Sequence, residues 1–187
     1  IRLMVANSAA HMTEHLFNAV VSVVLPIIVA SLGLNLSQAG ALASARTLLA
    51  GAASFPSGFL ADLARRRNWL LGGCIALIGV SCFGLSVSSG FAMLMVFMAL
   101  AGFGGGWFHP QSLSILSARY SERKAFALGV HDSSANLGEV VGPLVIGVLL
   151  AFFDWRTTLA LWALPALFIG IGYAVWGSEG ELAVPRP

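Results

Sequence analysis

The stretch Gly58-Phe-Leu-Ala-Asp62-Leu-Ala-Arg65-Arg66-Arg67 is the densest cluster of charge in a chain that is otherwise mostly apolar. Long apolar runs lie on both sides of it. One acidic and three basic side chains this close together predict a water-exposed turn, because a charged side chain inside a bilayer is costly. The turn therefore separates two membrane-spanning helices, and the side of the membrane that it faces fixes the direction of every other segment.

The composition of the whole chain agrees with this interpretation. Of its 187 residues, 58% are hydrophobic and only 10% are charged, and the mean hydropathy is +0.87. A soluble domain carries about 25% charged residues, so this chain has too little polar surface to coat a soluble globule. We expect an all-α polytopic membrane protein rather than an enzyme, without a cofactor. The net charge of +2 comes from short basic clusters, so nucleic acid is not implied as a partner.

Six segments are long and apolar enough to cross a bilayer, which takes about 20 residues. They are residues 4–32, 37–61, 69–88, 91–118, 125–153 and 157–177. All five connections are short, so consecutive helices must run antiparallel beside one another, and Ser37 is expected to cap the second helix. The sequence thus predicts one six-helix bundle over residues 1–177, followed by a polar, proline-ended linker or tail over residues 178–187.

The basic residues of the short connections predict the orientation. One set of helix ends holds Arg2, Arg65, Arg66, Arg67, Arg119, Arg123, Lys124 and Arg186, whereas the other set holds only Arg156. We therefore expect both termini and the arginine turn to be cytoplasmic, in a multi-pass protein of the inner cell membrane.

Polar residues recur inside the first apolar segment in steps of three and four. They are Asn7, His11, Glu14, His15, Asn18 and Ser22. This spacing places all six on one face of a helix. Such a face must meet protein or a water-filled cavity, because an ionisable group that faces lipid costs at least about 2.5 kcal/mol.

Three later segments also carry ionisable groups within their apolar spans: Arg46, His109, His131, Asp132 and Glu139. At 1.5 Å per residue, the histidines, Glu14 and Asp132 lie at similar depths in the cytoplasmic half, with Arg46 and Glu139 nearer the midplane. The pattern predicts a polar cavity that binds a solute or relays protons. The alternative is a set of buried pairs that only hold the helices together.

The segment His11-Met-Thr-Glu14-His15 fits H-x-x-E-H, the pattern in which two histidines hold zinc and a glutamate activates water. The geometry is possible because residues i and i+4 share a helix face. However, the sequence offers no clear third ligand, and the polar stripe continues past His15. A metal site is therefore not predicted.

Glycines indicate where helices approach closely. The second segment carries a stripe of small residues: Gly40, Ser44, Thr47, Gly51, Ser54 and Gly58. The fifth carries a packing motif: Gly138, Gly142, Pro143 and Gly147. The fourth has glycines at 102 and 104–106 before Pro110, which predicts a deformable helix.

Two of these motifs resemble those of the major facilitator superfamily. The stretch Gly58 to Arg67 is similar to the family's G-x-L-a-D-r-x-G-r-k loop between helices 2 and 3, and residues 138–147 are similar to its G-x-x-x-G-P-x-x-G-G motif on helix 5. Gly102-Phe-Gly104 followed by Phe108-His109-Pro110 resembles the fosmidomycin-resistance-like branch. The chain departs from the family at Leu63, Arg65 and Ile146, and Met98 is nearest to the position of the arginine on helix 4 of many proton-coupled members.

The resemblance implies the N-terminal half of a twelve-helix transporter, built from two inverted three-helix repeats. Two such bundles rock around a midplane site, and the partners would be lipid, a small solute and a second bundle, supplied by a C-terminal half or another copy. Asp62, with Gly58 and Arg66, would form the gating loop, because Asp62 would cap a helix of the opposite bundle.

Proton-coupled transport of a small organic or drug-like solute is thus the first hypothesis. The alternative is a non-transporting half-bundle that scaffolds a larger membrane complex with other subunits.

Overall fold

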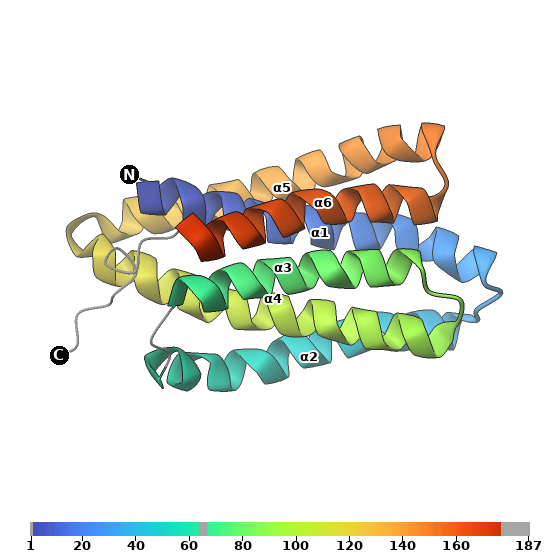
Figure 1. The fold of residues 1–187 in the computed structure, drawn as a ribbon, viewed down its shortest axis with the longest axis horizontal. Coiled ribbons are helices and arrows are strands. Elements are labelled where there is room, and N and C mark those ends of the chain that lie inside the picture. The colour runs from blue at the N-terminus through green and yellow to red at the C-terminus, as the bar shows by residue number, and fades with distance from the viewer. Residues whose placement is uncertain (1, 64–66, 177–187) are drawn as a thin grey trace.

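Six long α-helices run up and down in the computed structural model, which describes residues 2–63 and 67–176 (Figure 1). They are α1 (Arg2–Ser31), α2 (Leu36–Leu63), α3 (Arg67–Ser86), α4 (Phe91–Arg119), α5 (Lys124–Phe152) and α6 (Trp155–Trp176), with a short 3-10 turn at Ser121–Arg123. Every boundary lies within two residues of the position expected from hydropathy. The proposed tail at residues 178–187 lies outside the described part of the chain.

The connection between α1 and α2 shows local sequence control of a boundary. Gly33 has φ = 62°, and the N–H groups of Gly33 and Leu34 donate to the carbonyls of Ala30 and Val29, at 3.4 and 2.9 Å. This is a Schellman ending, for which glycine is favoured. The sequence predicts Ser37 as the N-cap of α2, and this prediction is wrong. Asn35 takes that role, because its side chain and that of Gln38 each accept the other's backbone N–H, at 2.9 and 3.0 Å.

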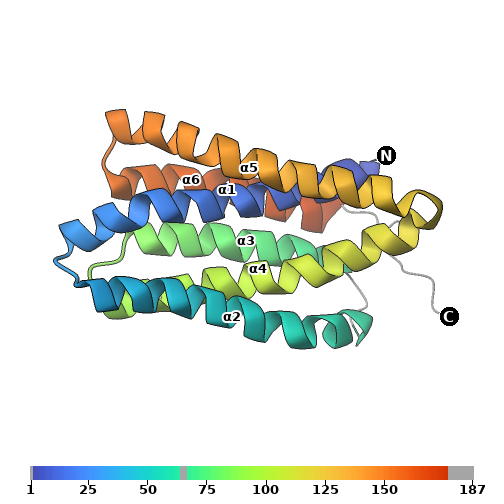
Figure 2. The same ribbon diagram turned by 180° about the vertical axis from the view of Figure 1, so that it is seen from behind.

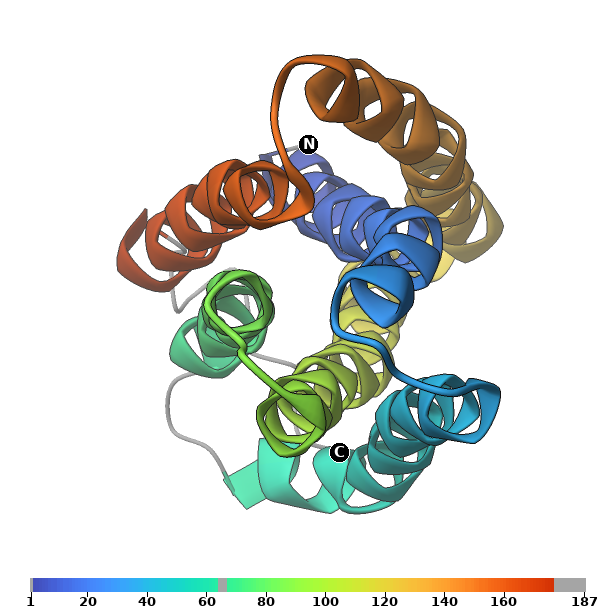
Figure 3. The same cartoon turned by 90° about the vertical axis from the view of Figure 1, so that its right-hand side faces the viewer.

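The helices pack in three principal pairs: α1 with α5, α2 with α4, and α3 with α6. Figure 2 shows α2 beside α4 on one flank and α5 beside α1 on the other. Seen from the end, α5 lies outside α1 and α2 lies outside α4 (Figure 3), and the buried interior draws most of its residues from α1, α3 and α4. Phe108, Leu71, Ile75 and Ile146 are fully buried there.

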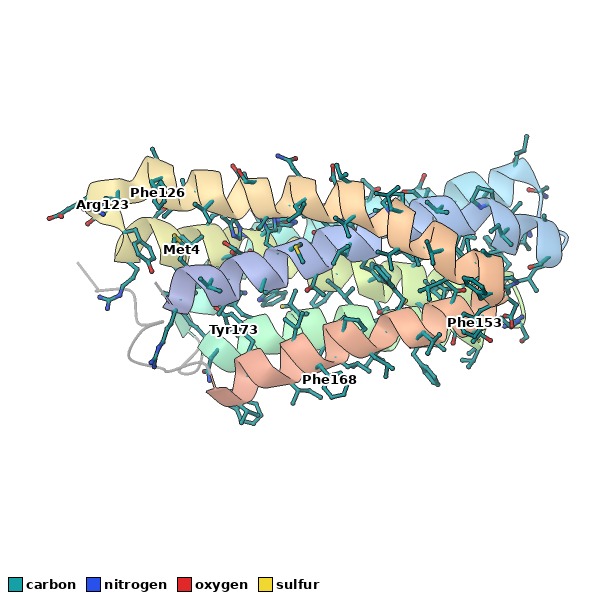
Figure 4. All side chains as sticks on the ribbon, turned by 90° about the horizontal axis from the view of Figure 1, so that it is seen from above. Met4, Arg123, Phe126, Phe153, Phe168 and Tyr173 are labelled. Atoms are coloured by element: carbon teal, nitrogen blue, oxygen red, sulfur yellow. The ribbon has the colours of Figure 1, made fainter. Side chains whose placement is uncertain are left out.

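Charge separates the two ends of the bundle. Arg2, Arg67, Arg119 and Lys124 stand at helix ends on the side of the α4–α5 turn, where Figure 4 also shows Arg123, whereas Phe153 lies at the opposite end. The basic residue expected at that opposite end, Arg156, donates from Nη1 to the carbonyl of Ser86, the last residue of α3, at 2.7 Å. It also covers the ring of Trp155. Arg156 therefore has a structural role there.

Large apolar side chains cover the outside of the bundle. Phe55 and Phe168 are 94% and 74% exposed, and Phe168 points away from its neighbours in Figure 4. Five helices, all except α2, are long and apolar enough to cross a membrane. Helix α2 has the length, with 28 residues, but Arg46 and its serines and glycines lower its hydropathy.

Glycines bring α4 close to α2, although not those that the sequence suggested. A Cβ atom at Gly102 or Gly106 of α4 would clash with the backbone carbonyls of Arg46 and Ala50. By contrast, a Cβ at Gly40, Gly51 or Gly58 of α2 would meet nothing within 4 Å. The three glycines of the predicted small-residue stripe of α2 therefore do not make this contact, although Ser54 of the stripe does.

Pro110 lies inside α4 without breaking it. Proline has no N–H to donate to the carbonyl four residues earlier, which here belongs to Gly106. The hydroxyl of Ser54, on α2, donates to that carbonyl at 2.8 Å and also contacts the carbonyl of Ala50 at 2.8 Å. A side chain of the neighbouring helix thus satisfies the group that proline leaves free, as membrane bundles require.

Replacing Ser54 with alanine should destabilise the pairing of α2 with α4. The carbonyl of Gly106 would then lose its hydrogen-bond donor, which costs about 1–3 kcal/mol when the group is buried. We expect the free energy of unfolding in detergent to fall by that amount. Thr47→Ala is the control, since Thr47 is exposed and its hydroxyl bonds only to its own helix, at Ala43. Equal stability of the two variants would contradict this role of Ser54.

Candidate functional site

All four histidines of the chain gather in one cluster, drawn from α1, α4 and α5. The ring of His11 stacks on that of His131, with centroids 3.8 Å apart and planes 11° apart. His15 and His109 meet His11 edge-on, with centroid distances of 4.7 and 4.9 Å. Residues more than a hundred positions apart in the chain therefore form one group, and their similar depth is as the sequence suggested.

Glu14 lies at the centre of this cluster and is only 3% exposed. Its Oε2 atom lies 3.3 Å from Nε2 of His109 and 3.4 Å from Nε2 of His15. Its Oε1 atom accepts a hydrogen bond from Nδ2 of Asn18 at 2.8 Å. A Cβ atom at Gly105 of α4 would approach Oε1 to 2.8 Å, so this glycine leaves the space that the carboxylate occupies.

The buried side of the cluster is a hydrogen-bonded network that fixes ring tautomers. Nδ1 of His11 lies 3.0 Å from the carbonyl of His131 and must carry the proton, because a carbonyl only accepts. The hydroxyl of Ser112 donates to Oδ1 of Asn7 at 3.0 Å and therefore accepts from Nε2 of His131 at 3.1 Å. In the neutral rings, Nε2 of His11 and Nδ1 of His131 are left with lone pairs, and both atoms are buried without a hydrogen-bond partner in the part of the chain that the structure describes.

The other side of the cluster reaches the surface. Nδ1 of His15 lies 2.9 Å from Oε1 of Glu139 on α5, whose side chain is 57% exposed. The side chain of His109 is 36% exposed, and Asp132 is exposed nearby. On α5, then, His131 faces the interior, whereas Asp132 and Glu139 lie on the outer surface.

Arg46 joins the cluster through an intermediary. Its Nη2 atom donates to Oδ1 of Asn18, and Asn18 donates in turn to Glu14. The guanidinium and the carboxylate also interact through their charges. The arginine of α2 is thus coupled to the buried carboxylate of α1 without contacting Oε2.

The packing motif of α5 is split by the structure. Gly138 and Gly142 face α1, where added Cβ atoms would lie 2.6 Å from the carbonyl oxygen of Met12 and 2.9 Å from Cβ of Ala19. Gly147 meets nothing within 4 Å. Pro143 lies within the unbroken helix beside Gly142. The first two glycines therefore place α5, with His131, against the polar face of α1.

Two residues of the site were missed by sequence reasoning. Gly105 precedes His109 by four positions and Ser112 follows it by three, so helical spacing from His109 would have found both. The proposed gating loop is only partly visible. Gly58 lies in α2 with open space beside it, whereas the side chain of Asp62, and Arg66 altogether, lie outside the described residues.

A family model described as Major Facilitator Superfamily matches residues 8–187. The chain belongs to the major facilitator superfamily. Among curated proteins, it is 28% identical over 176 residues to the puromycin resistance protein pur8 of Streptomyces alboniger, covering 90% of this chain and 34% of that protein. It is also 30% identical over 165 residues to the membrane sensor protein UhpC of Escherichia coli (strain K12), covering 86% of this chain and 36% of that protein.

A third relative is a probable hexose phosphate transport protein of Chlamydia trachomatis, 25% identical over 147 residues, covering 78% of this chain and 32% of that protein. The chain thus spans about a third of the length of these curated relatives. None of them concerns the fosmidomycin-resistance-like branch, which stays a prediction.

Solved structures of this superfamily share the fold. A bacterial homologue of the human lysosomal transporter Spinster superimposes with a TM-score of 0.82 at 17% identity, over 99% of this chain and 45% of that one. A POT-family transporter in complex with a thioalcohol-conjugated peptide superimposes with a TM-score of 0.79 at 18% identity, over 96% of this chain and 39% of that one. The chain therefore shares the helical fold of these transporters.

The contact between Glu14 and His109 should be energetically coupled. In a double-mutant cycle with Glu14→Gln and His109→Gln, we expect a coupling energy of about 0.5–3 kcal/mol in the free energy of unfolding in detergent, the range for residues that share a network. A matched cycle of Glu14→Gln with Glu122→Gln, in the exposed turn after α4, should give a value near zero. Additivity in the first cycle would show that the two side chains do not interact.

Proposed function

We propose that this chain forms one bundle of a proton-coupled transporter that moves a small organic solute by alternating access. The observation that supports this most directly is the cluster of Glu14 with four histidines, drawn from α1, α4 and α5, inside an apolar bundle. Intramembrane ionisable groups are rare and usually mark solute or proton pathways. The names of two relatives, for hexose phosphate transport and puromycin resistance, favour small organic solutes.

The proton pathway that we propose begins at the exposed carboxylates of α5. Asp132 and Glu139 stand between the surface and His109 and His15, and these two histidines contact Glu14. A proton arriving at Asp132 or Glu139 can therefore reach the buried carboxylate through one imidazole. Arg46, linked through Asn18, would favour the charged form of Glu14 when the proton leaves, a role that the family often gives to an arginine on helix 4.

We further propose that all six helices span the membrane as two inverted three-helix repeats, with both termini cytoplasmic in the inner membrane. The packing pairs support the repeat. In two matching repeats, α1, α2 and α3 correspond to α4, α5 and α6. The pair α1–α5 then corresponds to the pair α4–α2, and the pair α3–α6 corresponds to itself, as the observed packing requires. The basic residues at one end support the orientation.

A second six-helix bundle, from the same protein or from another copy, would complete the transporter. The chain covers about a third of its curated relatives, and the family's loop motif, with Gly58, Asp62 and Arg66, is expected to meet a helix of the opposite bundle. Alternating access needs two bodies that move around a central site, so the partner bundle belongs to this proposal.

Transport should fail when the buried carboxylate cannot ionise. The full gene product, in proteoliposomes with an imposed pH gradient, is tested with puromycin and a hexose phosphate as probe solutes. We expect Glu14→Gln and Asp132→Asn to reduce pH-driven flux at least tenfold, because each variant removes a proton-binding carboxylate while keeping its shape. Glu122→Gln, outside the cluster, should leave the flux unchanged. Undiminished flux in both cluster variants would refute proton coupling through these residues.

The second candidate is a sensor or scaffold subunit that does not transport. One relative bears the name of a membrane sensor, and Met98 stands near the position of the usual helix-4 arginine. In that case the purified protein would bind a solute, or copurify in fixed stoichiometry with unrelated subunits, without moving the solute across the vesicle membrane.

A further inference from the structure

We propose that His11, His15 and His109, together with Glu14, form a binding site for one divalent transition-metal ion of the zinc type. One ring nitrogen from each of the three histidines lies within 4.8 Å of the other two. The proposal goes beyond transport, since binding of the ion requires neither a gradient nor a second bundle.

Two of the ligand spacings around Glu14 match those of a tetrahedral site. Its Oε2 atom lies 3.3 Å from Nε2 of His109 and 3.4 Å from Nε2 of His15. Zinc bonds to nitrogen and oxygen are about 2.0–2.1 Å long, so neighbouring ligand atoms of a tetrahedron stand about 3.3–3.4 Å apart. The three histidine nitrogens, which lie within 4.8 Å of one another, would draw closer together around a bound ion.

A buried lone pair of His11 has no partner in the described part of the cluster. Nδ1 of His11 donates to the carbonyl of His131, so the lone pair of its neutral ring is on Nε2. That atom is buried and lacks a hydrogen-bond partner among the described residues, and Oε2 of Glu14 is approached by the Nε2 atoms of His109 and His15, while His11 and Glu14 are only 4% and 3% exposed. A bound cation would satisfy both atoms at once.

The outer atoms of the histidines are held as metal ligands require. Nδ1 of His15 is bonded to a carboxylate, Glu139, at 2.9 Å, and Nδ1 of His11 to a backbone carbonyl at 3.0 Å. Histidines that bind metals usually donate their second ring N–H to such groups, which orients the ring and raises its basicity. Both histidines of α1 therefore keep Nε2 free of this outer bond, and Nε2 of His15 faces Glu14.

The surrounding charges favour a divalent cation. Glu14 lies within the ligand set, and Glu139 and Asp132 stand beside His15 and His109 from α5. Against them is one cation, Arg46 of α2, whose Nη2 bonds to Asn18 and leaves Oε2 of Glu14 free. His131, the fourth histidine, stacks on His11 from the buried side, and its Nε2 is taken by Ser112. His131 supports the site without being a ligand.

This arrangement supplies what the H-x-x-E-H pattern lacked. The sequence showed two histidines and no third ligand, and His109 of α4 now stands in that place. Glu14, whose Oε2 lies beside the nitrogens of His15 and His109, would be the fourth ligand, so the four ligands would close the coordination shell. Catalytic zinc sites keep one position open for water. We therefore infer binding and not hydrolysis.

Protons and the metal would compete for the same lone pairs. Protonation of the imidazoles or of Glu14 removes the ligand atoms, so metal affinity should fall as the pH falls. Protons and the metal ion would reach the site from the same side, past the exposed carboxylates of α5, where the side chain of His109 is 36% exposed.

The experiment uses the full gene product in detergent, purified without a polyhistidine tag and stripped with a chelator. Zn²⁺ alone is titrated by calorimetry at pH 7.5 and 5.5, and Co²⁺ by visible absorption, which reports tetrahedral coordination. We expect one ion per chain, at least tenfold weaker binding at pH 5.5, and an intense tetrahedral Co²⁺ spectrum. Mg²⁺, which prefers oxygen ligands in an octahedron, should not compete.

Three variants test the ligands and one tests the space around them. His15→Gln, His109→Gln and Glu14→Gln should each weaken Zn²⁺ binding at least tenfold and change the Co²⁺ spectrum. Gly105→Ala, which displaces the Glu14 carboxylate, should do the same, whereas Gly129→Ala, in open space on α5, should not. Circular dichroism verifies that each variant is folded.

Two results would overturn the proposal: absence of stoichiometric Zn²⁺ binding by the folded wild-type protein, or binding retained in all three ligand variants. Because no gradient is applied, a failure here is separate from a failure of proton-coupled transport.

Discussion

The burial of the Glu14 carboxylate is the constraint around which this bundle is arranged. A charged group taken out of water without partners costs several kcal/mol, and this one is 3% exposed inside an apolar fold. Its partners come from other turns and helices: Asn18 from the same face of α1, His109 from α4 and, through Asn18, Arg46 from α2. His109 and Arg46 reach Glu14 or Asn18 only if α4 and α2 pack against α1 at a fixed position along its length. The polar cluster therefore specifies how three helices meet, which apolar packing alone does not.

Helix α4 makes this register possible through its glycines. Gly102 and Gly106 admit the backbone of α2, Gly104 admits the carbonyl of Cys74 on α3, and Gly105 admits the carboxylate of Glu14. Three neighbours thus approach the same short stretch from three directions. The sequence predicted that these glycines make the helix deformable, which stays a prediction; in the structure the helix is continuous. Their shared property is the missing side chain, which brings His109 within reach of α1.

Hydropathy and helical period predicted the helix bounds and the polar face of α1, because both depend on local sequence. What a face meets depends on the neighbouring helices, and there the sequence was less informative. On α5, spacing grouped the polar residues but did not show that His131 is fully buried while Glu139 is 57% exposed. The glycines of α2 looked like a packing stripe, yet the close approach comes from α4. His109 could not be assigned to the His11–Glu14–His15 group, because that contact links residues about a hundred positions apart.

The outer surface of the bundle is apolar in some places and acidic in others. Phe55 and Phe168 are exposed and apolar and suit lipid. Asp132 and Glu139 are exposed and acidic, on the outer surface of α5 beside the cluster. A carboxylate that faces hydrocarbon costs at least about 2.5 kcal/mol, so two on one helix cost about as much as the whole stability of a marginally stable fold. Water or protein against this face would remove that cost. The same physical requirement that surrounds Glu14 with histidines therefore supports the proposed polar cavity between this face of α5 and a second bundle.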